Sequence, residues 1–175
     1  MGTVLENQLL YSRNWAFIDA DTQQRLDRTL LLTAGTGLGS VVAATAARTG
    51  FGRFVLADGD VVERSNLNRQ AFGVRHLGRN KAEAAAEIVH DIRPDAEVRV
   101  VPAFLTEQTL PDVIRDADIV LNTIDFDDPV FLACNRIARR FGKPTLLPMN
   151  LGWGAALYVF APDGPGIEDV FAGEL

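Results

Sequence analysis

The sequence is poor in cysteine, because Cys134 is the only one among its 175 residues. A single cysteine forms no disulfide within the chain and cannot build a cysteine-based zinc site. The opening residues MGTVLENQLL contain neither a basic segment nor a long apolar one, so we expect no signal peptide. These features favour a reducing compartment and predict a cytoplasmic protein.

Basic residues and long apolar runs are also scarce. The 17 Lys and Arg residues are outnumbered by 23 Asp and Glu residues, which gives a formal net charge of −6. This balance argues against a general nucleic-acid binder, because phosphate contacts need a basic surface. The apolar runs are far shorter than the about 18 residues that suggest a membrane-spanning helix, so we expect no membrane span. The apolar content of 47% still suffices for the core of one domain.

Short apolar stretches alternate with alanine-rich or amphipathic stretches along the chain. This alternation predicts βαβ units, and therefore an α/β, Rossmann-like, mostly parallel sheet with helices on both faces. The last strand follows its predecessor through a link too short for a crossover helix, which predicts an antiparallel strand near the C-terminus. We expect strands over 29–34, 53–58, 97–104, 118–125, 143–150 and 154–164, and helices over 41–49, 80–92, 106–117 and 128–141.

A helical arm is predicted before the first strand. Tyr11, Trp15 and Phe17 are spaced like one face of a short helix. Asp21 followed by Gln24 has the pattern of a capping box for a second helix. The single predicted domain, residues 1–175, comprises the arm (1–28), a nucleotide-binding core (29–160) and a tail (161–175).

A glycine-rich turn joins the first strand to the first helix of the core. Gly35, Gly37 and Gly39 let the backbone approach a phosphate, and the helix beyond them offers free amide groups at its N-terminus. Asp58 ends the second strand, where Rossmann folds keep the acid that binds ribose hydroxyls. These features by themselves predict binding of NAD. A Walker A sequence is absent, because no Gly-Lys-Ser/Thr follows the glycines.

The loop after the second strand is densely polar, which a dinucleotide site does not require. Asn66, Arg69 and Gln70 lie at i, i+3 and i+4 and share one face if the segment forms a helical turn. Arg69 offers a planar donor fork for phosphate oxygens, and Lys81 adds a point charge one helix further on. Asp125 ends the fourth strand, at the same edge of a parallel sheet, and is suited to Mg²⁺. The set predicts a triphosphate site.

The whole pattern, D-x-D-x5-N-L-x-R-Q followed by a lysine and a late T-x-D, resembles the ThiF/MoeB/HesA family, relatives of ubiquitin-activating enzymes. The resemblance runs from Tyr11 to Phe160. It implies a homodimeric adenylyltransferase that uses ATP and Mg²⁺, forms an acyl-AMP on a carboxylate and releases pyrophosphate. The implied acceptor is the C-terminal glycine of a ubiquitin-like or sulfur-carrier protein, or a peptide.

The same resemblance implies a role for each matching residue. An early arginine of the family reaches the partner's ATP across the dimer interface, so Arg13 is the candidate here. The implied catalytic residues are Arg13, Arg69, Lys81 and Asp125, with Asp125 as the Mg²⁺ ligand. The implied nucleotide-binding residues are Gly35, Thr36, Gly37, Gly39, Asp58, Asn66, Arg69, Gln70 and Lys81.

Several positions depart from the family pattern. Ala34 and Thr36 stand at the first and third places of the usual G-x-G-G-x-G loop. Thr36 adds a side chain that contributes a hydroxyl to the phosphates or narrows the pocket. Phe126 follows Asp125 where the family has asparagine. The segment GPGIEDVF lacks the paired cysteines of many members, so we expect no zinc.

Two other functions remain as alternatives. The glycine loop and Asp58 also fit an NAD(P)-dependent oxidoreductase, although no His or Tyr-Lys pair suited to hydride chemistry stands out. The other alternative is a non-catalytic, nucleotide-binding partner subunit. The nearly complete set of predicted phosphate-binding residues argues against it. Cys134 lies in the apolar run PVFLACNRIA, so we expect a buried thiol without a catalytic role. We expect His76, beside the polar loop, at the surface.

Overall fold

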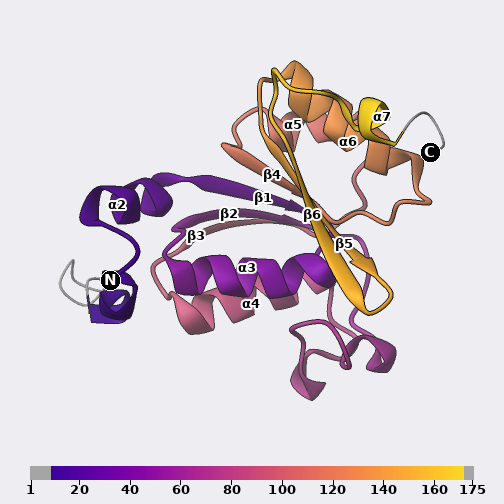
Figure 1. Cartoon of the computed structure of the whole chain (residues 1–175). Coiled ribbons are helices and arrows are strands. Elements are labelled where there is room, and N and C mark those ends of the chain that lie inside the picture. The colour runs from indigo at the N-terminus through magenta and orange to yellow at the C-terminus, as the bar shows by residue number, and fades with distance from the viewer. Residues whose placement is uncertain (1–8, 172–175) are drawn as a thin grey trace.

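A six-stranded sheet forms the centre of the molecule, with helices on both faces (Figure 1). The computed structural model describes residues 9–171. The strand order is β3-β2-β1-β4-β5-β6, and the first five strands run parallel. The predicted Rossmann-like class is confirmed. The strands are β1 (Leu30–Ala34), β2 (Arg53–Ala57), β3 (Glu97–Val101), β4 (Ile119–Asn122), β5 (Thr145–Leu151) and β6 (Gly154–Phe160).

Helices cover both faces of the described sheet, α3 and α4 on one face and α5 and α6 on the other (Figure 1). Successive residues of a strand point to opposite faces, and the core follows this rule. Leu31 and Phe54 pack among alanines of α3 and α4, whereas Leu32 and Val55 pack with residues of α5 and α6. Because alanine is small, α3 and α4 lie close to the sheet. The helices are α3 (Gly37–Thr49), α4 (Lys81–Ile92), α5 (Leu110–Ile114) and α6 (Pro129–Arg140).

The last two strands form the predicted antiparallel pair. β5 and β6 are joined by Gly152 and Trp153, and Gly152 has the left-handed φ of 62° that glycine adopts without strain. The pair projects beyond the rest of the sheet (Figure 1). A short helix, α7 (Ile167–Val170), follows in the predicted tail. Within residues 9–171, the helices are too short or too polar to cross a membrane.

Side-chain caps set where several helices begin. Asp19, not Asp21, caps α2 (Ala20–Arg28), because its carboxylate accepts a 2.7 Å hydrogen bond from the Thr22 N–H. The predicted capping box at Asp21 is therefore wrong. Asp21 lies instead in the first turn, where its negative charge interacts favourably with the helix dipole. Asn80 and Asp128 cap α4 and α6 in the same manner as Asp19.

The arm before β1 is anchored at the amino-terminal edge of the sheet. The predicted helical face at Tyr11, Trp15 and Phe17 is not formed, because the chain makes a single turn there, η1 (Ser12–Asn14). Tyr11 is buried and donates a hydrogen bond to a carbonyl near the C-terminus of α3, while Trp15 and Phe17 are exposed. The three aromatic residues therefore do not share one face, because the chain turns between them.

Arg93, at the C-terminus of α4, ties this arm to the core. Its guanidinium lies 5.8 Å from the centre of the Tyr11 ring, a cation–π contact. It also donates a 2.9 Å hydrogen bond to the Gly50 carbonyl and pairs with Asp27 of α2. One buried cation thus connects the arm, α2, α3 and α4.

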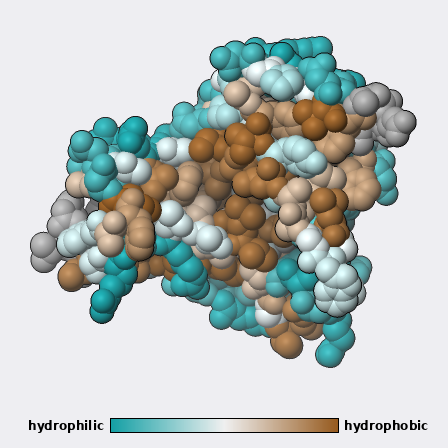
Figure 2. All heavy atoms as spheres, viewed as in Figure 1, coloured by the Kyte–Doolittle hydropathy of each residue, from teal (hydrophilic) through white to brown (hydrophobic). Residues whose placement is uncertain are grey.

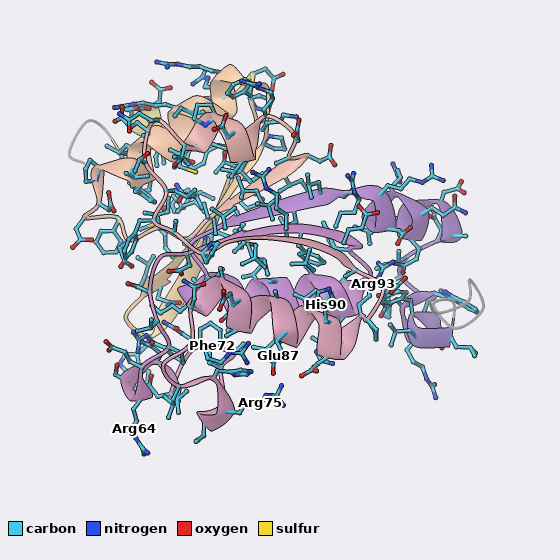
Figure 3. All side chains as sticks on the ribbon, turned by 180° about the vertical axis from the view of Figure 1, so that it is seen from behind. Arg64, Phe72, Arg75, Glu87, His90 and Arg93 are labelled. Carbon is cyan, nitrogen blue, oxygen red and sulfur yellow. The ribbon has the colours of Figure 1, made fainter. Side chains whose placement is uncertain are left out.

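An ion-pair cluster ties the polar loop to the outer face of α4, seen from behind in Figure 3. Arg75, in the turn η3 (Val74–His76), pairs with Asp91 and Glu87, and Arg79 pairs with Glu87. His76 is buried beneath them, so its predicted surface position is wrong. The reason is local, because its Nδ1 accepts a 2.9 Å hydrogen bond from the Gly73 N–H.

Burial and the neighbouring Arg75 lower the pKa of His76 below its ordinary value. The hydrogen bond from Gly73 adds to this effect, because it needs a free lone pair on Nδ1. The pKa of Glu87 is also lowered, mainly by the hydrogen bond from Arg79. Both groups therefore bind protons less readily in the folded chain than in the unfolded chain.

We expect the free energy of unfolding to decrease as the pH falls below about 6.5, the ordinary pKa of histidine. The unfolded chain then binds a proton at His76, while the folded chain keeps the ring neutral until the lower folded pKa is passed. Glu87 contributes in the same direction below its ordinary pKa. The His76→Asn variant keeps an acceptor near Nδ1 but does not titrate, so its decrease should be shallower, by up to about 1.4 kcal/mol per pH unit. Urea unfolding across this range measures both slopes.

At about pH 8 both residues at position 76 are uncharged, so any difference there reports packing alone. Equal slopes for the two proteins below the ordinary pKa of histidine would contradict the buried neutral histidine.

Candidate functional site

One cavity opens where the parallel strands end. The chain leaves β1 toward β2 and leaves β4 toward β5, so the direction of the sheet reverses between β1 and β4. In open α/β sheets, ligands bind beside such a switch point. The cavity has a volume of about 360 Å³ and is lined by the loops after β1, β2, β3 and β4 and by the end of β5. The predicted site residues that line it are Gly35, Gly37, Asp58, Asn66, Arg69, Gln70, Lys81 and Asp125.

The glycine loop lies against the end of β4. Gly35 has a left-handed φ of 84°, and a Cβ atom there would lie 2.6 Å from the Thr123 carbonyl oxygen. The Thr123 hydroxyl donates to the Gly35 carbonyl at 2.6 Å. At Gly39 a Cβ atom would collide with the Thr33 side chain and lie 2.8 Å from Thr123 Oγ1. Gly35 and Gly39 are thus required by close packing, and α3 begins with its amide groups at the cavity.

Asp58 binds the back of this loop. Its Oδ2 accepts hydrogen bonds from the Thr36 N–H at 2.6 Å and from the Thr36 hydroxyl at 3.0 Å. Its Oδ1 accepts from the Asp60 N–H at 2.9 Å. Thr36 is fully buried and is not among the cavity-lining residues, so its hydroxyl faces Asp58 rather than the cavity.

The polar loop contains a short turn, η2 (Arg64–Asn66), and Asn66 at its end lines the cavity together with Arg69 and Gln70. Asn66 Oδ1 accepts from the Glu63 N–H, and the N–H groups of Arg69 and Gln70 both donate to the Asn66 carbonyl. This continues the helical turn and confirms that Asn66, Arg69 and Gln70 converge. Gln70 Oε1 is buried without a hydrogen-bond partner among the described residues, so the amide is available to a ligand.

Lys81 is held in an ion pair that the sequence does not reveal. Its ammonium Nζ donates to Asp60 Oδ2 at 2.7 Å, although the Lys81 residue is largely buried. Asn80 braces the same region, because its side-chain amide donates to the Asp58 and Asp60 carbonyls. Asp60 appears in the D-x-D pattern, but sequence reasoning assigned it no role. Its pairing with Lys81 places it in the site.

The carboxylates of the cavity fit a magnesium site. Asp58, Asp60 and Asp128 line it together with Asp125, but Asp58 accepts from Thr36, Asp60 pairs with Lys81 and Asp128 caps α6. Asp125 is the cavity carboxylate without a side-chain partner among residues 9–171. Within that range no three His, Cys, Asp or Glu side chains form a metal-binding group. Mg²⁺ in nucleotide sites uses one or two carboxylates and completes its shell with phosphate oxygens and water, so this set fits.

One end of the cavity is apolar, which the sequence does not indicate. Phe104, two-thirds exposed, lies against Gly59, where a Cβ atom would be 2.6 Å from the Phe104 N atom. Ala57 and Leu105 pack together and line the cavity as well, and Phe131 lines it from α6. These residues come from three separate segments, so no local pattern marks them. The cavity therefore has an apolar end beside a charged one.

Arg13 lies far from this cavity, at the opposite edge of the sheet. Its turn packs where α3 and α4 end, whereas the glycine loop lies where α3 begins. The exposed Arg13 side chain is not among the cavity-lining residues. Gly39 also does not line the cavity, because it contacts Thr33 behind the loop. The other predicted contacts, apart from Thr36, converge as expected.

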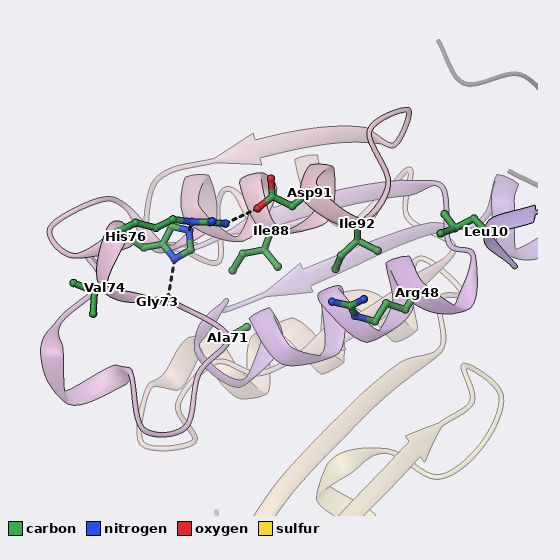
Figure 4. Close-up of a pocket in the computed structure, with 10 residues that line it drawn as sticks. Leu10, Arg48, Ala71, Gly73, Val74, His76, Ile88, Asp91 and Ile92 are labelled. Atoms are coloured by element: carbon green, nitrogen blue, oxygen red, sulfur yellow. Dashed lines mark hydrogen bonds and ion pairs between the residues drawn. The ribbon is translucent and has the colours of Figure 1, made fainter. Parts of the chain in front are cut away.

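A larger hollow, of about 870 Å³, lies on the outer side of α3 and α4 (Figure 4). Its walls combine aliphatic side chains with the paired Arg75 and Asp91. The glycine loop and Asp125 are not part of it. We therefore assign the chemistry to the smaller cavity. The larger hollow is lined by Leu10, Arg48, Ala71, Gly73, Val74, Arg75, His76, Ile88, Asp91 and Ile92.

Cys134, on the buried side of α6, is fully buried in the core, as expected. Burial raises the pKa of its thiol to about 12. The thiolate, which is the nucleophilic form, is therefore strongly disfavoured at neutral pH.

Comparison with known proteins identifies the family. The sequence profile described as the ThiF family matches residues 11–174. The chain belongs to the ThiF family. The resemblance stated from the N-L-x-R-Q block is thereby confirmed.

Proteins with curated names are similar over most of the chain. The SAMP-activating enzyme E1 of Haloferax volcanii is 33% identical over 145 residues, which cover 82% of this chain and 53% of that protein. The sulfur carrier protein ThiS adenylyltransferase of Escherichia coli is 31% identical over 156 residues, covering 87% and 62%. The chain thus spans between half and two-thirds of the length of these relatives.

A solved structure supports the same fold. The tRNA N6-threonylcarbamoyladenosine dehydratase of Escherichia coli, in complex with ATP, aligns with a TM-score of 0.75 at 29% identity. The alignment covers 80% of this chain and 58% of that one. A Rossmann-like sheet with a nucleotide site is therefore found in a solved relative.

We expect Gly35→Ala to lower the free energy of unfolding by about 2 kcal/mol or more, because a Cβ atom at a left-handed φ would strike the Thr123 backbone. Gly73→Ala is the matched control. Gly73 has an extended backbone with open space around its Cβ position, so a change within about 0.5 kcal/mol is expected. Urea unfolding of both variants measures this difference. Similar losses in the two would contradict the close approach of the loop to β4.

Proposed function

We propose that this chain is an adenylation domain, which uses ATP and Mg²⁺ to convert a carboxylate into an acyl-AMP with release of pyrophosphate. The observation that carries the proposal is the composition of one cavity. A glycine loop with a helix N-terminus, Lys81, Arg69, Gln70 and the carboxylate of Asp125 all meet at the carboxyl edge of the sheet. Such a set suits a triphosphate and a metal.

The two ends of the cavity fit the two ends of ATP. The apolar surface at Phe104 suits a flat base, and Asp58, between this surface and the loop, suits the ribose. Arg69, Lys81 and the amides at the start of α3 then lie where the phosphates follow. Lys81 exchanges its partner in this proposal, because a phosphate oxygen takes the place of Asp60.

The reaction needs positioning and charge neutralisation rather than a protein nucleophile. The acceptor carboxylate attacks the α-phosphorus, and the bond from the α-phosphorus to the bridging oxygen of pyrophosphate breaks. Arg69 and Lys81 neutralise charge that builds on the phosphate oxygens. Mg²⁺, held by Asp125, supplies further charge stabilisation at the phosphates when bound. The buried Cys134 takes no part.

The acceptor proposed for this reaction is a C-terminal glycine carboxylate of a ubiquitin-like or sulfur-carrier protein, or of a peptide. The named relatives support this class, because one activates SAMP and another adenylylates the sulfur carrier ThiS. An oxidoreductase would use the glycine loop and Asp58, but it leaves the convergence of Arg69, Gln70 and Lys81 without a purpose.

We also propose that the chain acts as a homodimer in which Arg13 serves the partner's cavity. Arg13 lies at the opposite edge of the sheet from its own cavity, so a role in catalysis requires a second copy. An uncovered apolar surface supports this proposal (Figure 2). Leu157 and Val159 of β6 are exposed by more than half, and Val159 pairs with Leu146, which packs on the α3 and α4 side. Large surfaces of this kind mark protein interfaces.

We expect MgATP at about 100 times its dissociation constant to raise stability by about 2.7 kcal/mol, several degrees in melting temperature. EDTA should reduce this shift, and NAD⁺ should give none. Arg69→Ala and Lys81→Ala should abolish most of it, because each removes a phosphate contact. Arg64→Ala is the matched control, because Arg64 lies on the same loop but not among the cavity-lining residues. Thermal unfolding with each ligand measures these effects.

A shift with NAD⁺ alone would overturn the adenylation proposal in favour of an oxidoreductase. Full shifts with MgATP in both Arg69→Ala and Lys81→Ala would show that the nucleotide binds elsewhere.

The dimer proposal makes a separate prediction for mixed variants. Arg13→Ala and Lys81→Ala should each lose most ATP–pyrophosphate exchange with a carrier protein that ends in glycine. A mixed dimer has one site with both defects and one intact site, so an equal mixture should recover up to about a quarter of the wild-type rate. The assay is exchange of labelled pyrophosphate after the two variants are unfolded and refolded together. A mixture as inactive as its components would contradict the role of Arg13 in the partner's site.

A further inference from the structure

Thr36 occupies hydrogen-bond acceptor sites on the Asp58 carboxylate. Its N–H and its hydroxyl both donate to one oxygen of that carboxylate, Oδ2, at 2.6 and 3.0 Å. Thr36 is fully buried, so neither hydrogen bond competes with bulk water. The Asp60 N–H occupies one site on the other oxygen, Oδ1, at 2.9 Å. Asp58 thus holds three donors from the chain itself.

A carboxylate has about four acceptor sites, two on each oxygen. Both sites on Oδ2 are filled by Thr36, and one of the two on Oδ1 is filled by Asp60. Among the described residues, nothing further donates to the Asp58 carboxylate. One acceptor site therefore remains, on Oδ1, for a ligand hydroxyl.

We propose that Thr36 is a specificity-determining residue that restricts Asp58 to a single ribose hydroxyl. The inference rests on the proposed function, in which Asp58 faces the ribose of ATP. An aspartate with both oxygens available holds the 2′- and 3′-hydroxyls together. Here only one of them finds an acceptor, so the site takes ribonucleotides and also one of the two deoxynucleotides.

The restriction depends on the side chain at position 36. Glycine, which the family pattern has at this place, keeps the backbone donor but has no hydroxyl. Without it, Oδ2 regains one acceptor site, and the space left by the side chain lets the carboxylate turn toward the ribose. Thr36 is thus a positioning residue, because it acts through Asp58 and not by contact with the nucleotide.

The test measures dissociation constants of ATP, 2′-deoxyATP and 3′-deoxyATP with Mg²⁺ by titration calorimetry. For the wild-type protein, one deoxynucleotide should bind about tenfold more weakly than ATP, and the other within about twofold of ATP. Thr36→Ser keeps the hydroxyl and should preserve this asymmetry. Thr36→Gly should lose it, with both deoxynucleotides weakened by at least about threefold.

The ratio of the dissociation constants of a deoxynucleotide and ATP, measured on one protein, does not depend on the stability of that protein. The asymmetry itself is measured on the wild type alone. Equal weakening of the two deoxynucleotides in the wild type would overturn the inference while leaving the proposed function intact. An unchanged asymmetry in Thr36→Gly would show that Thr36 is not its cause. Failure of ATP itself to bind would overturn the proposed function, and this inference with it.

Discussion

The contact between the glycine loop and Thr123 sets the geometry on which the site depends. Thr123 donates its hydroxyl to the Gly35 carbonyl, and its own carbonyl occupies the space of a side chain at position 35. This contact joins the ends of β1 and β4 at the point where the sheet changes direction. The start of α3 and Asp125 therefore lie at the same opening. A looser contact would separate the N-terminus of α3 from Asp125, which lines the same cavity.

The polar loop is held in place from both sides, although much of it is exposed. Asn80 bonds the Asp58 and Asp60 carbonyls, and Lys81 pairs with Asp60. On the outer side, Arg75 and Arg79 fix the loop to α4. The side chains that face the cavity thus extend from a braced frame, which lowers the entropy that a ligand must remove on binding.

Features with a local signal were predictable from the sequence, and those made by distant segments were not. The apolar runs identified the strands, and the i, i+3, i+4 spacing correctly placed Asn66 and Gln70 together. The hydrogen bonds from Thr36 to Asp58 join residues 22 positions apart, so no local sequence pattern indicates them. The Phe104 surface likewise depends on how separate loops meet. His76 was misplaced because its burial comes from a turn and an overlying ion cluster rather than from hydropathy.

The length of α3 separates the two ends of this molecule. Its 13 residues span about 20 Å, with the glycine loop at one end and the anchored arm at the other. If the arm supplies an arginine to another chain, each molecule taken alone lacks part of its own machinery. Activity then depends on the concentration of the chain itself. Dilution lowers the fraction of chains that are paired, and the activity per chain falls with it.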